Sequence, residues 1–172
     1  GLDGLKWPKS RAYDGTMKTA LLVAFFLFSA LLAAATVQVG SPLPALTLKD
    51  QRDASTTITT DTRYLIFVAE RAASALVETA LDGQTATTLA AAKVRYVADI
   101  SAMPGIVTTV IALPKMRKRP YPMLLGRSAD ETSVLPREPG KVTLITSADG
   151  RITAIRFIAD AATLRAALGL VP

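Results

Sequence analysis

The sequence contains no cysteine and no histidine among its 172 residues. Without a thiol the protein cannot perform disulfide exchange or thiol peroxidation, and it cannot form a thiolate metal site. The missing imidazole removes the usual acid–base and nucleophilic machinery built around histidine. An oxidising compartment permits disulfides without requiring them in a domain of this size, so the composition is compatible with export.

A strong excess of one charge is also missing. The formal net charge is +6, and removal of residues 1–35 leaves 16 basic and 12 acidic residues, a net charge of +4. This excess is too small to indicate a nucleic-acid partner, and we expect none. One dense group of basic residues, here called the basic cluster, is interpreted as a solvated loop, with contact to anionic lipid or an acidic partner as the alternative. The basic cluster consists of Lys115, Arg117, Lys118 and Arg119.

The only long hydrophobic run lies near the N-terminus. Residues 20–35 carry no charge, follow Lys18 and end in three alanines. These features predict a signal peptide that is cleaved near Ala35. The uncharged run over residues 19–37 also approaches the roughly 17 to 25 residues that a spanning helix needs, so an uncleaved membrane anchor is the alternative.

The hydrophobic run sets the expected domain organisation and location. Met17 resembles a natural start, which makes residues 1–16 an upstream or vector-derived segment without an assigned role. Residues 17–35 are then the signal peptide or anchor, and residues 36–172 form one domain. We expect an exported protein of the periplasm or cell envelope, with membrane contact only through residues 19–37 if that segment remains uncleaved.

The remaining chain alternates strand and helix patterns. The apolar run 63–69 predicts a central strand, and the helix predicted over 70–81 follows it directly. Pro104 suits the first turn of a helix over 103–113, and Pro114 is predicted to end that helix. Other expected elements are an edge strand within 39–50, a brief strand around Ile58, a helix over 87–92, strands over 94–100 and 121–125, a hairpin turning at Asp149-Gly150, and a helix over 160–168. This order predicts an α/β fold with a mixed sheet and helices on both faces.

Three short stretches carry a resemblance to a known superfamily. The opening Val39–Pro44, the stretch Leu65–Glu70 and the terminal hairpin with its helix resemble exported thioredoxin-like and peroxiredoxin-like proteins. The likeness covers residues 39–169 and implies a thioredoxin-like mixed sheet flanked by helices. The chain is also similar to short proteobacterial envelope proteins, some of which carry a flavin-dehydrogenase label. No Gly-x-Gly-x-x-Gly follows a strand here, so we expect no cofactor.

The resemblance also shows which reactive groups are missing. Alignment with the superfamily's Trp-Cys-Gly-Pro-Cys motif places Arg71 at the tryptophan and Ala72 and Ala75 at the two cysteines. The position of the superfamily's cis-proline falls on Val142, and a shifted alignment that places Pro139 there is the alternative. The resemblance therefore implies a redox-inactive member, neither a thiol-disulfide oxidoreductase nor a peroxidase, and no catalytic residue is assigned.

Candidate binding residues lie where the superfamily places its chemistry. They are Glu70, Arg71, Ser74, Asp99, Ser101 and Val142. Each also has an ordinary structural interpretation, because acidic residues and serine favour helix starts and loops. Glu70 and Asp99 are too weak a pair to indicate acid–base work or a metal site.

The sequence thus leads to one function hypothesis and two alternatives. The first is a non-catalytic thioredoxin-like protein of the cell envelope that binds a partner protein or a small anion. The second is a thiol-independent enzyme that uses Glu70, Asp99 or a bound flavin. The third is an accessory subunit of a membrane complex, anchored by residues 19–37.

Overall fold

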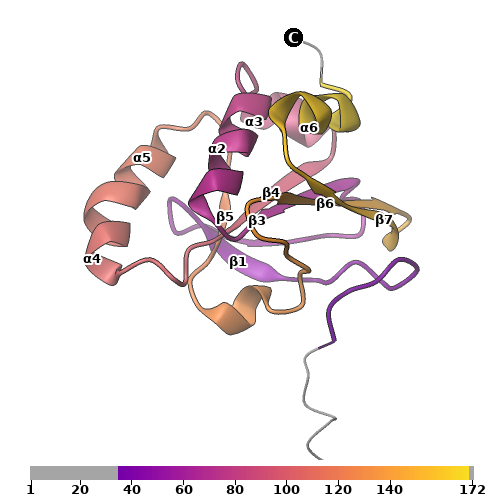
Figure 1. Ribbon diagram of the computed structural model, residues 1–172, viewed down its shortest axis with the longest axis horizontal. Coiled ribbons are helices and arrows are strands. Elements are labelled where there is room, and N and C mark those ends of the chain that lie inside the picture. Colours follow the sequence, from indigo (N-terminus) through magenta and orange to yellow (C-terminus); the bar gives the residue numbers. More distant parts are fainter. Residues whose placement is uncertain (1–34, 171–172) are drawn as a thin grey trace, which may run out of the picture. The chain divides into compact units, whose positions relative to one another are not determined.

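The computed structural model describes residues 35–170. The chain divides into two units, residues 1–34 and 35–172, and the predicted signal or anchor segment lies almost entirely outside the described residues. Among the residues described, no helix is both long enough and apolar enough to cross a membrane. The second unit consists of a β-sheet and the helices packed on it (Figure 1).

A seven-stranded mixed sheet forms the centre of this unit, in the order β2-β1-β5-β4-β3-β6-β7. Strand β3 pairs in parallel with β4 and antiparallel with β6, and β6 and β7 form the hairpin predicted at Asp149-Gly150. The strands are β1 (Thr47–Asp50), β2 (Ser55–Thr57), β3 (Tyr64–Val68), β4 (Val94–Asp99), β5 (Leu124–Gly126), β6 (Val142–Ala148) and β7 (Arg151–Ile158). The α/β class and the central position of β3 are confirmed.

The alternating side chains of β3 separate two hydrophobic clusters, because successive strand residues point to opposite faces. Ile66 and Val68 belong to the larger cluster, whereas Leu65 and Phe67 belong to the smaller one. All four side chains are at most 2% exposed. A strand covered on both faces explains the continuous apolar run in the sequence.

The helices pack mainly on one face of this sheet (Figure 1). The buried apolar residues of α2 (Arg71–Ala80), α3 (Ala86–Ala91), α5 (Leu113–Arg117) and α6 (Ala161–Leu168) all join the larger cluster. On the other face, Leu43 from the N-terminal segment and Leu135 from a loop join the smaller cluster. The sequence predicted helices on both faces, and this part of the prediction is wrong, since the N-terminal segment and the loop after the short 3-10 helix η3 (Ala129–Thr132) cover the second face.

Strand β1 is an inner strand, which corrects the predicted edge position. The three-residue strand β2 pairs antiparallel on its outer side, with Thr47 opposite Thr57. The hydroxyl groups of these two threonines lie 2.7 Å apart. The polar, threonine-rich composition of β2 gave only a weak strand signal around Ile58, although this strand protects the edge of β1.

The helix that contains Pro114 continues past this residue, which corrects the predicted end. Helix α4 (Gly105–Val107) leads into the π-helical turn η2 (Thr108–Ala112), and α5 follows directly. The N–H of Leu113 bonds to the carbonyl of Thr108, five residues earlier. Proline lacks a backbone N–H and crowds the preceding helical turn. The wider π turn places Pro114 in the first turn of the next helical segment, where a residue needs no N–H donor.

A buried glutamine holds the end of α5 against the sheet. Gln51 is 0% exposed and follows β1 directly. Its amide nitrogen donates to the carbonyl of Tyr121 at 2.9 Å, and its amide oxygen accepts from the N–H of Met123 at 2.8 Å. Its backbone carbonyl accepts a hydrogen bond from the Arg117 guanidinium at 2.9 Å. One residue thus joins β1, α5 and the segment that enters β5.

Candidate functional site

The candidate site lies at the start of α2, immediately after the central strand β3. Val68 ends β3, and α2 begins only three residues later, at Arg71. Ala72 and Ala75 lie in the first turns of this helix, and both are exposed. The two positions that match the superfamily's cysteines therefore lie at the predicted strand–helix junction, where only methyl groups are available.

Glu70 is the N-cap residue of α2, but its side chain does not cap the helix. Its Oε2 atom instead accepts a hydrogen bond from the backbone N–H of Gly140, at 3.0 Å. Gly140 has a φ of 70°, a left-handed conformation that glycine adopts without strain. The contact fixes the start of α2 to the loop that precedes β6.

A small cavity of about 130 Å³ lies between this loop and the end of β3. Its apolar walls include Phe67, Ala69 and Pro139. The charged side chains Glu70, Arg137, Glu138 and Lys141 also line it, and the Lys141 ammonium pairs with the Glu138 carboxylate at 2.7 Å. The cavity has the size of a small side chain or a few water molecules.

The carboxylate of Asp99, at the end of β4, is enclosed by donors from the protein itself. Its side chain is only 4% exposed. One oxygen accepts from the backbone N–H and the hydroxyl of Ser101, at 2.9 and 2.6 Å. The other accepts from the hydroxyl of Thr132 at 2.7 Å and from the Arg137 guanidinium at 3.0 Å.

These donors determine the protonation state of Asp99. Burial tends to raise its pKa, but the hydrogen bonds from Ser101, Thr132 and Arg137 together bring the pKa below the ordinary value for aspartate. Asp99 is therefore an anion at neutral pH with its acceptor positions in use. Such a group organises loops well and transfers protons poorly.

Ser74 and Val142 face the interior of the protein. The hydroxyl of Ser74 lies 3.2 Å from the phenol oxygen of Tyr96, a buried residue on β4. Burial strongly raises the pKa of Tyr96, so this phenol stays neutral. Val142 opens β6 and is 0% exposed, and none of the described peptide bonds is cis. A ligand-binding role for either residue stays a prediction.

The structure thus brings only some of the predicted residues together. Glu70 borders the cavity, Arg71 is exposed on the first turn of α2, and Asp99 and Ser101 form the network that holds Arg137. Within residues 35–170, no group of three acidic side chains could hold a metal ion.

Arg137 is the main site residue that the sequence did not reveal. Its guanidinium carbon lies 5.1 Å from the centroid of the Phe67 ring, and the same group pairs with Asp99. It also donates to the carbonyl and the hydroxyl of Thr132, at 3.1 and 3.2 Å. Periodicity gives no signal for such a residue, because it lies in a polar loop and its partners are 5 to 70 residues away in sequence.

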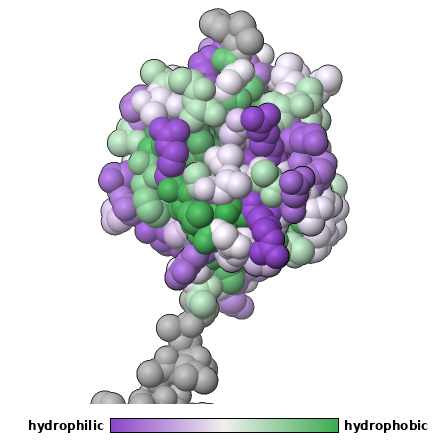
Figure 2. All heavy atoms as spheres, turned by 90° about the vertical axis from the view of Figure 1, so that its right-hand side faces the viewer, coloured by the Kyte–Doolittle hydropathy of each residue, from purple (hydrophilic) through white to green (hydrophobic). Residues whose placement is uncertain are grey.

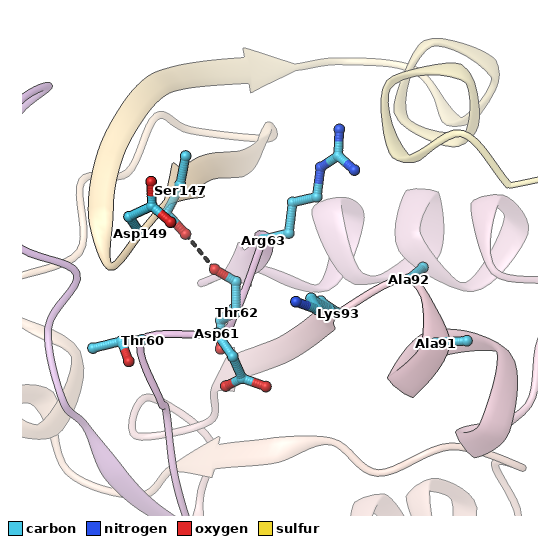
Figure 3. Close-up of a pocket in the computed structure, with 10 residues that line it drawn as sticks. Thr60, Asp61, Thr62, Arg63, Ala91, Ala92, Lys93, Ser147 and Asp149 are labelled. Carbon is cyan, nitrogen blue, oxygen red and sulfur yellow. Dashed lines mark hydrogen bonds between the residues drawn. The ribbon is translucent and has the colours of Figure 1, made fainter.

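A larger and more open cavity of about 800 Å³ lies at the other end of β3 (Figure 3). The Ser147 hydroxyl donates to the carbonyl of Thr62 there, at 2.5 Å. In Figure 3 the side chains of Asp61 and Arg63 point in different directions and do not converge on a common point. This arrangement does not define a site for a charged ligand.

The basic cluster forms the end of a helix, which corrects its interpretation as a loop. Lys115 and Arg117 lie in the last turn of α5, and Lys118 is its C-cap residue. Basic residues are favourable there because the helix C-terminus carries a partial negative charge. Arg117 pairs with Asp53 at 3.7 Å and Arg119 with Glu78 at 2.5 Å.

Comparison with solved structures identifies the fold as thioredoxin-like. A candidate protein disulfide isomerase from Bacteroides thetaiotaomicron is 15% identical, with a TM-score of 0.54 over 77% of this chain and 87% of that one. The thioredoxin domain of a thiol-disulfide oxidoreductase from Bacteroides vulgatus is 16% identical, with a TM-score of 0.52 over 78% and 97%. A peroxidoxin from Mycobacterium tuberculosis is 13% identical, with a TM-score of 0.52 over 79% and 99%.

Sequence comparison adds nothing to this result, since no family model and no curated protein matches the chain. At these identities the structural likeness establishes the fold alone. The protein therefore has a thioredoxin-like fold without cysteines, as the sequence predicted, and it cannot perform thiol redox chemistry.

Proposed function

We propose that the protein is a non-catalytic member of the cell envelope that binds a partner protein at the start of α2. The observation that carries this proposal is the cavity beside α2, next to a helix whose cysteine-equivalent positions are Ala72 and Ala75. The scaffold keeps an accessible surface at this junction and presents no reactive group on it.

The chemistry of the cavity supports a protein ligand. Phe67, Ala69 and Pro139 supply apolar wall, whereas Glu138 and Lys141 supply charge beside it. Protein interfaces typically combine an apolar centre with a polar rim, and an anchoring side chain in a small pocket contributes much of the affinity. A cavity of about 130 Å³ fits one such apolar side chain.

Site-specific photo-crosslinking in cells tests this proposal. A photoreactive amino acid at the exposed position Ala72 should form adducts with a discrete partner, whereas the same amino acid at exposed Thr87 on α3 should not. Ala69→Leu adds volume at the cavity and should abolish the adducts at position 72 while the thermal unfolding temperature is retained. Equal adducts at both positions, or adducts that survive Ala69→Leu in a folded protein, contradict the proposal.

A small anion at the same helix start is the second candidate. The first-turn N–H groups of α2 receive no side-chain cap, because the Glu70 carboxylate turns to Gly140. Helix N-termini attract anions through these groups and through the helix dipole. Titration with inorganic phosphate should then shift the amide resonances of residues 71–73, and Arg71→Gln should weaken the shift, whereas Arg156→Gln on β7 should not.

The proposed location rests on the N-terminal run of the sequence, which predicts export and either cleavage near Ala35 or retention as an anchor. N-terminal sequencing of protein from envelope fractions separates the two outcomes. A start at Thr36 indicates cleavage, and a start at Met17 indicates an anchored protein. Recovery in the cytoplasmic fraction alone contradicts the proposed location.

A further inference from the structure

The α4-η2-α5 helix exposes an unusually large amount of apolar surface. Four aliphatic side chains on it are exposed, namely Ile106 by 76%, Val107 by 38%, Val110 by 65% and Ile111 by 53%. Among the described residues, the only other large hydrophobic side chain exposed in this way is Val39. The helix lies on the opposite side of the molecule from β7 (Figure 1).

The C-terminal part of this helix packs on the domain. Leu113 is buried in the larger hydrophobic cluster, and Met103 and Met116 pack against it. The Gln51 side chain and the Arg119–Glu78 ion pair hold the C-terminal end. The helix is therefore anchored through Leu113 and Met116, whereas no residue of α4 or η2 is buried. A contiguous set of exposed aliphatic side chains on such a helix is typical of an interaction surface.

The charged residues in and around this helix are all basic. From Ile100 to Ala129 the sequence contains no acidic residue, and it contains five basic ones, the basic cluster and Arg127. Arg117, Arg119 and Arg127 pair with carboxylates elsewhere in the domain. Within residues 35–170, no carboxylate lies within ion-pairing distance of Lys115 or Lys118, and both lysines are exposed.

The two lysines also continue the apolar stripe. Residues three and four apart lie on the same side of a helix, so Ile111, Lys115 and Lys118 follow one another along the surface. Figure 2 shows the side of the molecule with β7, where hydrophobic and hydrophilic residues are interspersed. On the α4-η2-α5 helix the two kinds of side chain are separated instead, because the four exposed aliphatic residues occupy its N-terminal part and the two lysines its C-terminal end.

We propose that the α4-η2-α5 helix binds the surface of a bilayer that contains anionic lipid, with Ile106, Val110 and Ile111 in the acyl boundary and Lys115 and Lys118 at the lipid headgroups. Interfacial helices combine an apolar face with lysine-rich edges in this way. Lysine stems extend along apolar surface while their charges stay at the headgroups. The binding orients the folded domain on the membrane and does not require residues 19–37 to remain attached.

The absence of cysteine permits a local test in the full-length protein. A single Val110→Cys variant is labelled with an environment-sensitive fluorophore and mixed with vesicles of equal parts phosphatidylglycerol and phosphatidylcholine. The label should shift to the blue and brighten, because position 110 enters the bilayer. The same label at Ala162→Cys on α6 should not change, and this control separates binding through the helix from binding through the N-terminal run.

Charge-matched variants test the role of the lysines. A lysine near an anionic membrane contributes about 1 kcal/mol, so Lys115→Gln with Lys118→Gln should lower the ratio of inserted to free label about 30-fold. Lys49→Gln with Lys93→Gln removes the same charge from exposed positions elsewhere and should leave the ratio within a few-fold of the starting protein. Circular dichroism and thermal unfolding confirm that each variant is folded.

Three results would overturn the inference. The first is an unchanged label at position 110 in all vesicles, which shows that the helix stays in water. The second is an equal shift with phosphatidylcholine alone, which shows that anionic lipid is not recognised. The third is a shift without vesicles that grows with protein concentration, which shows that a second copy of the chain covers this face.

Discussion

The carboxylate of Glu70 accepts a hydrogen bond from the backbone N–H of Gly140, 70 residues later in the chain. This contact joins the two halves of the candidate site, the start of α2 and the loop before β6. The chain contains no thiol, and in this region an acidic side chain closes a loop.

Replacement of Glu70 should release the loop before β6. Glu70→Ala removes the acceptor for the Gly140 N–H and should cost about 1 kcal/mol of the free energy of unfolding. The amide hydrogen of Gly140 should then exchange faster with solvent, as measured by NMR. Glu70→Gln retains an acceptor oxygen and serves as the control. If Gly140 exchange is the same in both variants, the hydrogen bond does not hold the loop.

Asp99 should make stability depend on pH. Its pKa is lowered in the folded protein, so the ionised carboxylate stabilises the fold at pH values above the ordinary aspartate value of about 3.9, and this contribution disappears as the pH falls through the lowered value. Asp99→Asn should therefore cost about 2 kcal/mol at neutral pH, typical of hydrogen bonds to a charged group, and much less at strongly acidic pH. Urea unfolding across this pH range measures the difference. A cost that does not change with pH contradicts the assignment.

Gly126 should tolerate no side chain while Thr132 is present. A Cβ atom at position 126, at the end of β5, would collide with the Cγ2 methyl of Thr132. Gly126→Ala should therefore destabilise the protein by about 1 to 3 kcal/mol, as overpacking usually does. Thr132→Ser removes that methyl and keeps the hydroxyl that donates to Asp99. The double variant should regain part of the loss, and a double-mutant cycle measures this coupling. Additive effects would contradict the predicted collision.

A thiol restored at the start of α2 should be acidified by the helix. In a single Ala72→Cys variant, the unsatisfied N–H groups and the dipole of α2 should lower the thiol pKa below the free value of about 8.5. The pH dependence of alkylation by iodoacetamide measures this pKa. Ala90→Cys, near the end of α3, is the matched exposed control and should keep an ordinary or raised value. Equal pKa values for the two thiols would show that the start of α2 has no activating field.

The strand and helix order was predictable because it follows from local patterns. Short stretches of sequence are enough to predict three features: the buried strand within 63–69, the helix α2 directly after it, and the turn at Asp149-Gly150. The position of Ala72 and Ala75 followed from the same junction. By contrast, the inner position of β1 depends on pairing with the short polar strand β2, which has little local signal.

The site contacts that the sequence did not reveal join residues far apart in the chain. Arg137 meets Asp99 and Phe67, and Glu70 meets Gly140, only because the sheet brings distant loops to one edge. The sequence did not predict that the helix continues past Pro114, for a different reason. A proline normally stops a helix, and no sequence pattern predicts the π turn that accommodates Pro114 here.

The side chain of Gln51 has a mechanical consequence for the whole domain. Its hydrogen bonds connect the end of β1 to the C-terminal end of α5 and to the backbone that leads into β5. Tension on this helix is therefore transmitted to two strands at once. The helix can leave the domain only when these contacts break together, so its release and the separation of β1 from β5 should occur in a single cooperative step.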